Sequence, residues 1–364
     1  MIYIDSTQEK LYSMLETTEN VMNHLLATNT FSGNAKIVCN LDLGFPHDVI
    51  RIAGGFATGI YVYWNSKIPF VPIDICMNAC TVSVYKLDQI KSEIITENKV
   101  DELLNKLNSS SYIANFHRGN HFISYVESVI DGSRYIIVHS SAAEFETLYN
   151  GLYPVENNYF FDKIKIFYYD KQYIRYLDGQ AAELFQKMAA NLYAFNENRH
   201  DFIISLLVGQ DAKIHNSKHY HHYGMPSSNE AIIGCHLIEA GEQTPLLTQP
   251  GENIYIIQYN KTIDQEFLMM DKFTTPHGFG KCHLDVPNIK INITRNTFEL
   301  DSLEYKIKYG ESLRSHPNLQ LRNLPVEVFL DYLSMNYDYK IIQEFKQLVS
   351  YNKLGLIDWR KYEE

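Results

Sequence analysis

The first apolar residues of the chain recur at helical spacing. A pair that resembles a capping box, Ser6 with Glu9, precedes them. The apolar positions that then share one side of a helix are Leu11, Leu15, Met22, Leu25 and Leu26. This pattern predicts that the chain opens with an amphipathic helix.

Short apolar runs replace this spacing between residues 36 and 87. Glycine, proline and asparagine interrupt these runs, which is typical of strands joined by turns. Helical spacing returns over 88–107. Residues 120–141 then form two apolar runs around Asp131-Gly132-Ser133, which predicts a β-hairpin.

Two further helices are predicted in the second half of the chain. The first covers about 180–208, and its apolar stripe is expected to pack in the core. The residues of this stripe are Leu184, Phe185, Met188, Leu192 and Phe195. The second helix covers 337–353, and short strands are expected between the two. Together these segments predict an α+β fold.

Composition favours one soluble domain. The chain has 364 residues, of which 45% are hydrophobic and 21% charged, so it can bury a large core. No linker, repeat or low-complexity tract divides it, and residues 1–364 are therefore expected to form a single domain. The amino terminus does not resemble a signal peptide, and no segment reaches the length that spans a membrane.

Cysteine usage and charge narrow the location and the partners. The five cysteines are widely scattered, unlike a secreted disulfide framework, and they favour a reducing cytoplasm: Cys39, Cys76, Cys80, Cys235 and Cys282. The net charge of −11 argues against extensive wrapping of nucleic acid. A confined basic groove remains compatible with this charge.

The stretch "VPIDICMNAC" places an acid and two thiols beside an apolar run. Buried acids are rare unless they are paired or bind a metal. Asp74 and Cys76 are two residues apart, so in an extended chain they point to the same side and could share one metal pocket. The alternative is a turn at the end of a strand, with Cys76 and Cys80 as inert buried thiols.

Histidines stand at the ends of several predicted elements. His121 and His139 lie toward the open end of the hairpin, offset by about 10 to 13 Å along a strand, so small bends could bring both to one metal. His215 and His219 are four residues apart, as on one face of a helix. The alternative for this last pair is a solvated loop that is merely rich in histidine.

His277 stands in "TTPHGFGKCHL", between a proline and two glycines. Gly278 and Gly280 remove side chains beside the imidazole and allow a tight turn. A large ligand could therefore approach His277 closely. The alternative is a turn with an incidental polar residue.

These segments together resemble the RtcB family of GTP-dependent RNA-splicing ligases, and the similarity spans most of the chain. "IPFVPIDICMNACTVSV" is similar to that family's Asp–Cys motif after an apolar run, and "RGNHFISYV" to its Gly-Asn-His-Phe motif. "VHSS" resembles its His-Ser start, "IHN" its His-Asn motif, "NLYAFNENR" its helix with Tyr-Ala and Asn-Arg, and "HGFGK" its His-Gly-Ala-Gly-Arg motif. Order and rough spacing agree throughout.

The resemblance implies a metal-dependent nucleotidyl transfer site. It implies an RtcB-like domain with mixed sheets and peripheral helices around a central cleft, where one or two manganese ions bind. The implied metal ligands are Asp74, Cys76, His121, His139 and His215. His277 would be the nucleophile that takes GMP from GTP, and the other implied nucleotide contacts are Asn120, Gly278 and Gly280. The implied partner is RNA with a 3′-phosphate or cyclic phosphate and a 5′-hydroxyl end.

The sequence departs from the family at specific positions. In an ungapped comparison the family's metal-binding cysteine falls on Met77, a poor ligand for manganese because a thioether is neutral and soft. Cys76, one residue earlier, is therefore preferred as the ligand. The acid expected after Asn120 is Ser124, and the late lysine falls in "LPVEVFLD". These departures leave the preference for guanine open.

Three classes of function are compatible with these features. The first is a divergent RNA ligase or repair enzyme, supported by the polar motifs that follow one another in order. The second is a catalytically impaired relative that binds RNA, nucleotide or protein. The third is a metal-dependent phosphohydrolase or nucleotidyl transferase that acts on another substrate. The need for an accessory protein and the oligomeric state stay open.

Overall fold

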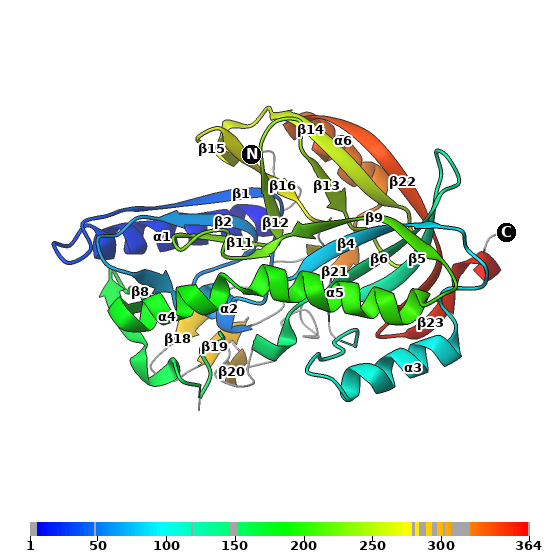
Figure 1. Cartoon of the computed structure of the whole chain (residues 1–364). Helices are drawn as coiled ribbons and strands as arrows, with labels where there is room; N and C mark the ends of the chain where they lie inside the picture. Colours follow the sequence, from blue (N-terminus) through cyan, green and yellow to red (C-terminus); the bar gives the residue numbers. More distant parts are fainter. Residues whose placement is uncertain are drawn as a thin grey trace.

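In the computed structural model the chain is mostly β-sheet, with a few helices around the sheets (Figure 1). The structure describes residues 6–46, 49–117, 119–145, 152–156, 158–278, 281–283, 289–292, 297–300, 303–306 and 321–362. Within these ranges the α-helices are α1 (Ser6–Leu26), α2 (Val49–Ala53), α3 (Glu97–Asn108), α4 (Gly179–Ala189), α5 (Leu192–Val208) and α6 (Val326–Asn336). The 3₁₀-helices are η1 (Ile73–Ile75), η2 (Ala143–Phe145), η3 (Phe161–Lys163), η4 (Gln265–Phe267) and η7 (Trp359–Tyr362). The predicted mixture of helices and sheets is confirmed.

The largest sheet has eight strands and curls into half a barrel (Figure 1). Its order is β13-β14-β22-β5-β6-β4-β9, with β23 paired to β22, and every pairing is antiparallel. The strands are β4 (Thr81–Asp88), β5 (Phe122–Ser128), β6 (Arg134–Ser140), β9 (Lys213–His221), β13 (Gln243–Leu246), β14 (Ile254–Thr262), β22 (Tyr337–Asn352) and β23 (Gly355–Asp358). The hairpin predicted around Asp131-Gly132-Ser133 is confirmed as β5 and β6.

Smaller sheets surround this one. A four-stranded sheet contains β1 (Ala35–Gly44), β2 (Thr58–Trp64), β11 (Glu230–Ile233) and β10 (Tyr223–Gly224). Two three-stranded sheets contain β12 (Cys235–Ile238), β16 (Lys272–Pro276) and β15 (Leu268–Met269), and β3 (Phe70–Pro72), β8 (Gln172–Asp178) and β7 (Lys165–Tyr169). The remaining strands are β17 (Lys281–His283) with β21 (Leu321–Asn323), and β18 (Ile289–Asn292) with β19 (Thr297–Leu300) and β20 (Leu303–Lys306).

The predicted opening helix is confirmed as α1. Its expected apolar residues are all buried, in a core shared with β1 and β2. Gln8 ties the first turn to β1 by donating to the carbonyls of Leu41 and Leu43. Apolar packing and the buried side-chain amide of Gln8 therefore both hold α1 against β1.

The helix predicted over 180–208 is two helices, α4 and α5. They separate at Asn191. In a continuous helix the Lys187 carbonyl would accept from a backbone N–H, but here it accepts from the side-chain amide of Asn191. Leu184 of the predicted stripe is exposed, whereas Phe185 is buried. Figure 1 shows α5 lying across the large sheet, where Ile203 and other apolar residues pack on β4 and β6.

Two other helix predictions are corrected. Residues 337–352 form the long strand β22 instead of a helix, because it pairs with β14 on one side and β5 on the other. Backbone bonding on both sides outweighs the helical appearance of its charge pattern. The helix predicted over 88–107 begins only at Glu97, after a cap in which Thr96 accepts from the Lys99 backbone N–H.

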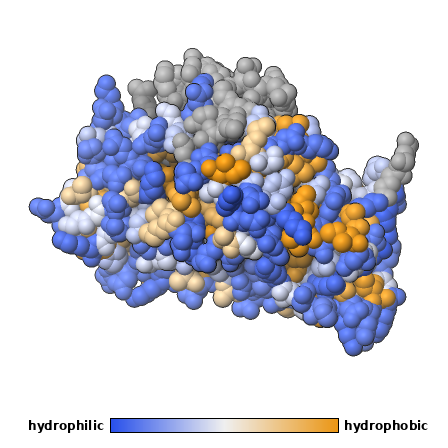
Figure 2. All heavy atoms as spheres, turned by 90° about the horizontal axis from the view of Figure 1, so that it is seen from above, coloured by the Kyte–Doolittle hydropathy of each residue, from blue (hydrophilic) through white to orange (hydrophobic). Residues whose placement is uncertain are grey.

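The face of the molecule seen in Figure 2 is mainly polar. Figure 2 shows polar side chains over most of one face, with smaller apolar patches between them. Among the helices of the described residues, none has the length and apolar character that a membrane crossing needs.

Candidate metal centre

Four neighbouring strands bring one cysteine and three histidines to the same end of the large sheet. In the order β9-β4-β6-β5, Thr81 pairs with His221, and His139 pairs with Val82 on one side and Phe122 on the other. The residues that flank or end these strands therefore converge: His222, Cys80, His139 and His121. All four are buried.

Three of these side chains form a compact group that could hold a metal ion: Cys80, His139 and His222. Cys80 Sγ lies 3.1 Å from His139 Nε2, and His139 Nε2 lies 3.2 Å from His222 Nε2. His121 Nε2 lies 3.6 Å from Cys80 Sγ and adds a possible fourth donor. Among the described residues this is the one group of its kind.

The spacing of the donors fits tetrahedral coordination. With metal–nitrogen bonds of about 2.0–2.1 Å and a metal–sulfur bond of about 2.3 Å, neighbouring ligand atoms lie about 3.3 to 3.6 Å apart. The two distances given for the three-residue group, 3.1 and 3.2 Å, are close to this range, whereas His121 lies within 3.6 Å of Cys80 Sγ but is not part of the group in which all donors are mutually close. A thiolate with imidazoles suits a borderline divalent ion such as zinc or cobalt, and it lacks the carboxylate typical of manganese sites.

Backbone carbonyls fix the orientation of two of the rings. His139 Nδ1 bonds the Asn120 carbonyl at 3.1 Å, and His121 Nδ1 bonds the Asn115 carbonyl at 3.1 Å. A carbonyl only accepts, so each Nδ1 carries the proton and each Nε2 keeps its lone pair. This arrangement, common around metal ligands, presents both Nε2 atoms to Cys80.

Burial favours the neutral form of His139 and His222. Burial lowers the pKa of His139 well below its ordinary value, and positive charge on His121 or His277 would lower it further. Burial likewise lowers the pKa of His222, with smaller contributions from His277, His139 and His236. Neutral imidazole is the form that binds a metal ion.

His277 stacks directly on the cluster. It follows β16, and its ring lies 4.6 Å from that of His222 at an interplanar angle of 16°. Its Nδ1 lies 2.9 Å from the Gly234 carbonyl and 2.5 Å from Asp42 Oδ2 on β1. Both contacts use Nδ1, which leaves Nε2 as the nitrogen that could attack a phosphorus atom.

The predicted ligands Asp74, Cys76 and His215 do not join this group. Asp74 is fully buried and accepts hydrogen bonds from the guanidinium of Arg175 on β8. Cys76 ends η1 in a left-handed conformation (φ 50°, ψ 77°), and its side chain packs beside Ile50 and Tyr153.

His215 lies on the exposed part of the edge strand β9. It is seven residues before His222, which is about 23 Å along a strand. The structure therefore brings together two of the five predicted ligands, His139 and, at the margin, His121. Cys80 and His222 take the places expected for Cys76 and His215.

The remaining residues that the resemblance singles out do not all lie at the cluster. Asn120 contributes its carbonyl to His139, and Gly278 forms an isolated bridge with Leu247. Gly280 lies outside the described residues. Met77 is buried in the apolar core, and Ser124 bonds Ser350 inside the large sheet, so neither faces the cluster.

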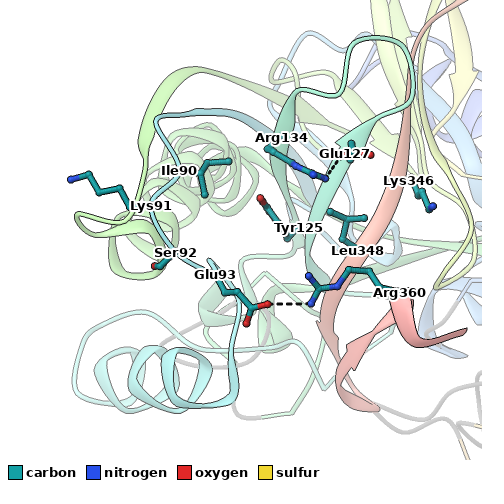
Figure 3. Close-up of a pocket in the computed structure, with 10 residues that line it drawn as sticks. All are labelled: Ile90, Lys91, Ser92, Glu93, Tyr125, Glu127, Arg134, Lys346, Leu348 and Arg360. Atoms are coloured by element: carbon teal, nitrogen blue, oxygen red, sulfur yellow. Dashed lines mark hydrogen bonds and ion pairs between the residues drawn. The ribbon is translucent and has the colours of Figure 1, made fainter. Parts of the chain in front are cut away.

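Two cavities bear on the confined basic groove that the charge of the chain leaves possible. One of about 630 Å³ reaches the cluster at His236, whose ring is 5.7 Å from His222, but two lysines and two glutamates line it. The other, of about 500 Å³, is lined by four cationic residues and two glutamates (Figure 3). It lies along the β5–β6 hairpin near Arg134, which pairs with Glu127. Neither cavity is a basic groove beside the cluster.

Sequence reasoning missed three residues of the site: Cys80 as the ligand, His222 and Asp42. Cys80 and His222 directly flank strands whose partners carry the other histidines, and strand pairing is the signal that could have found them. Asp42 interrupts the apolar run "NLDLGF" of β1 and is only 5% exposed, a pattern that indicates a paired carboxylate.

Comparisons with known proteins do not assign this chain to a family. No protein-family model matches the chain, and no curated protein is significantly similar to it. The site is therefore interpreted from its own residues.

Proposed function

We propose that this chain is a divergent RtcB-like RNA ligase that uses His277 as its nucleophile. It would join RNA ends with a 3′-phosphate or 2′,3′-cyclic phosphate to 5′-hydroxyl ends. The observation that carries the proposal is the stacking of His277, anchored through Nδ1, on a Cys80/His139/His222 group that could hold a divalent ion. The order of motifs that resemble the RtcB family supplies the choice of reaction.

The proposed first step forms a bond between His277 Nε2 and the α-phosphorus of GTP while the bond to pyrophosphate breaks. The Gly234 carbonyl accepts a hydrogen bond from Nδ1, and the Asp42 carboxylate, whose Oδ2 lies 2.5 Å from Nδ1, stabilises the positive charge that develops on the ring. Where the RNA end is a 2′,3′-cyclic phosphate, water first adds to its phosphorus and the bond to the 2′-oxygen breaks, which gives the 3′-phosphate. An oxygen of the RNA 3′-phosphate then displaces the histidine. Finally the 5′-hydroxyl attacks the RNA phosphorus, loses its proton and releases GMP.

Cys80, His139 and His222 would hold the metal ion, with His121 beside them. A bound divalent ion would neutralise charge that develops on phosphate oxygens. Manganese follows from the resemblance, whereas the donor set also suits zinc or cobalt. Loading with each of these ions separately tests the choice.

The adduct experiment tests the nucleophile. The protein is incubated with a divalent ion and GTP, and its intact mass is measured. A GMP-sized increase is expected on the unmodified chain and on His219→Ala, a control histidine on β9 that bonds Ser83, and it is expected to be absent from His277→Ala. An adduct that persists on His277→Ala contradicts the assignment.

A second candidate is a metal-binding relative without ligase activity, or a metal-dependent phosphohydrolase. The observation that favours it is the pairing of Asp74 with Arg175, which occupies a carboxylate that the resemblance assigns to the metal. Metal loading without an adduct from GTP or ATP supports this candidate. Release of phosphate from a nucleotide then distinguishes the hydrolase from the binding protein.

A further inference from the structure

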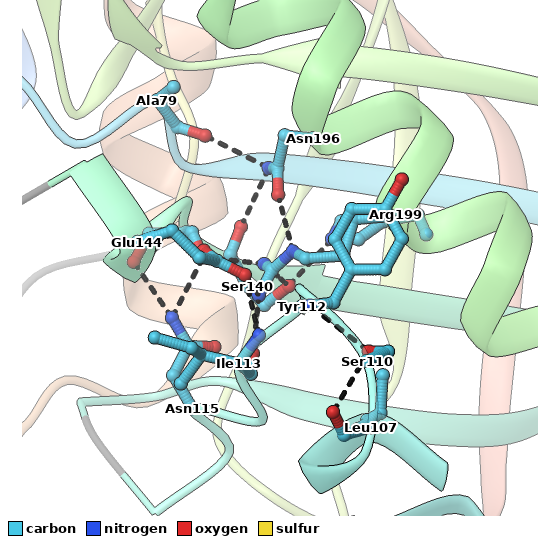
Figure 4. Close-up of polar contacts among 12 residues, drawn as sticks. Ala79, Leu107, Ser110, Tyr112, Ile113, Asn115, Ser140, Glu144, Asn196 and Arg199 are labelled. Carbon is cyan, nitrogen blue, oxygen red and sulfur yellow. Dashed lines mark hydrogen bonds and ion pairs between the residues drawn. The ribbon is translucent and has the colours of Figure 1, made fainter. Parts of the chain in front are cut away.

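Arg199 is completely buried next to Ser140, the residue that follows the proposed ligand His139. It projects from α5, and its guanidinium donates to Asn196 Oδ1 at 3.0 Å and to the Ile113 carbonyl at 2.9 Å. It also donates to Ser140 Oγ and to the Ser141 carbonyl (Figure 4). Ser140 and Ser141 directly follow the proposed ligand His139.

Asn196, one turn earlier in α5, connects a second ligand segment to the first. Its amide donates to the Ala79 carbonyl at 2.9 Å and to the Ser140 carbonyl at 3.1 Å (Figure 4). Ala79 precedes Cys80, as Ser140 follows His139. One side chain thus bonds the neighbours of two ligands, and its Oδ1 is held by Arg199.

A third ligand segment joins through Asn115. The Asn115 amide donates to the Ser141 carbonyl at 2.8 Å, and the Asn115 carbonyl accepts from His121 Nδ1. Arg199 bonds both segments that Asn115 connects, because it donates to the carbonyl of Ile113, close to Asn115, and to that of Ser141. The segments that carry Cys80, His139 and His121 are therefore tied to one pair of residues on α5.

Burial makes this network sensitive to position. A buried guanidinium is strongly unfavourable unless its donors are satisfied. Arg199 Nη1 lies 3.9 Å from Glu144 Oε1, and the oxygens that accept its hydrogen bonds at Ile113, Ser140 and Ser141 are neutral. Movement of a ligand segment away from α5 would leave these donors unpaired. The same bonds that satisfy Arg199 thereby fix where the ligands stand.

We propose that Arg199 and Asn196 are positioning residues that hold Cys80 and His139 at coordinating distance. This inference rests on the proposed metal centre. Neither residue touches the ion. Each acts through the backbone beside a ligand.

Cobalt titration of the full chain tests the inference, with affinity and the visible and charge-transfer bands of bound Co²⁺ as readouts. We expect Asn196→Asp, which keeps an acceptor for Arg199 but loses the donors to Ala79 and Ser140, to bind Co²⁺ about 10- to 100-fold more weakly. Arg199→Met should lose at least as much, and Arg199→Lys should recover part of it. The bands should shift in each variant that still binds.

Matched controls separate positioning from general stability. Arg175 is a largely buried arginine that donates to Asp74, and Asn336 is a buried asparagine that donates to Tyr332. Arg175→Met and Asn336→Asp should lower the melting temperature while leaving the affinity and the bands unchanged.

The outcomes distinguish the two proposals. Asn196→Asp or Arg199→Lys with unchanged affinity and bands overturns the positioning role while the metal centre stands. The same loss in the folded control variants also overturns it. An unmodified chain that binds no Co²⁺, Zn²⁺ or Mn²⁺ overturns the metal centre and this inference together.

Discussion

Breaking the ion pair between Arg175 and Asp74 should destabilise the fold and leave metal binding unchanged. Asp74 is fully buried, and the Arg175 side chain is 18% exposed. Arg175 Nε lies 3.1 Å from Oδ1 and 2.9 Å from Oδ2, and Nη2 also contacts Oδ1. The substitution Arg175→Met would therefore leave a buried carboxylate without its cation.

The expected loss follows from this burial. Removal of one partner from a buried ion pair costs about 3–5 kcal/mol, because the other charge stays in a poorly solvated site. The partial exposure of Arg175 places the expectation near the lower end, about 3 kcal/mol. Arg134→Met is the control, since Arg134 and Glu127 are 35% and 32% exposed, and an exposed pair contributes at most about 1 kcal/mol.

Urea unfolding measures both variants, and a double variant completes the comparison. Replacing both partners, Asp74→Leu with Arg175→Met, should restore much of the stability, because no charge is then left buried alone. Asp74→Asn should bind Co²⁺ as the unmodified chain does. If Arg175→Met costs no more than Arg134→Met, or if Asp74→Asn abolishes Co²⁺ binding, the structural role assigned to Asp74 is refuted.

Three further predictions concern the ligand, the packing and the effect of pH. Cys80→Ser should weaken Co²⁺ binding toward the upper end of the about 10- to 100-fold effects seen for residues that support a metal site. Cys76→Ser should leave Co²⁺ binding unchanged, and equal titration curves for the two variants would contradict the assignment of Cys80 as the ligand. Gly54→Ala should destabilise the protein in urea by at least about 1–3 kcal/mol, since a Cβ there would lie 2.1 Å from Asp74 Cβ; an unchanged midpoint would contradict this packing. Burial lowers the pKa of His200 well below its ordinary value, with Arg199 adding to the effect, so His200 is neutral when folded and binds a proton more readily when unfolded. Stability should therefore fall as the pH drops below about 6.5, by up to about 1.4 kcal/mol per pH unit from this residue, and His200→Gln should flatten the decline; the same slope in both proteins would contradict the assignment.

Local patterns in the sequence were sufficient for the elements that form from neighbouring residues. The helix α1 follows from its cap and apolar spacing, and the β5–β6 hairpin follows from Asp131-Gly132-Ser133 between two apolar runs. The offset of about 10 to 13 Å expected between His121 and His139 is wrong, because His139 pairs with Phe122 and the two rings lie 5.3 Å apart.

The strand β22 could not be recognised in this way, because its conformation depends on partners far away in the chain. Its neighbours β14 and β5 lie about 80 and 220 residues earlier, and both pair along its length. Tertiary hydrogen bonding of this kind overrides a local charge pattern.

Which cysteine and which histidines meet also depends on contacts between segments that are distant in the sequence. Cys76 and Cys80 are both buried, but Cys76 ends η1 in a left-handed turn and packs beside Ile50 and Tyr153, outside the cluster. His215 and His222 lie on the same strand and its extension, and the register of β9 with β4 decides which one meets Cys80. Neither the turn nor the register follows from the motif spacing.

Anomalous diffraction from crystals soaked separately with Mn²⁺, Co²⁺ and Zn²⁺ locates the metal centre. We expect an anomalous peak within bonding distance of Cys80 Sγ and of Nε2 of His139 and His222, with the His277 ring beside it. A peak at Asp74 or His215 instead, or no peak at the cluster with any of the three ions, would show that Cys80, His139 and His222 are not the metal ligands.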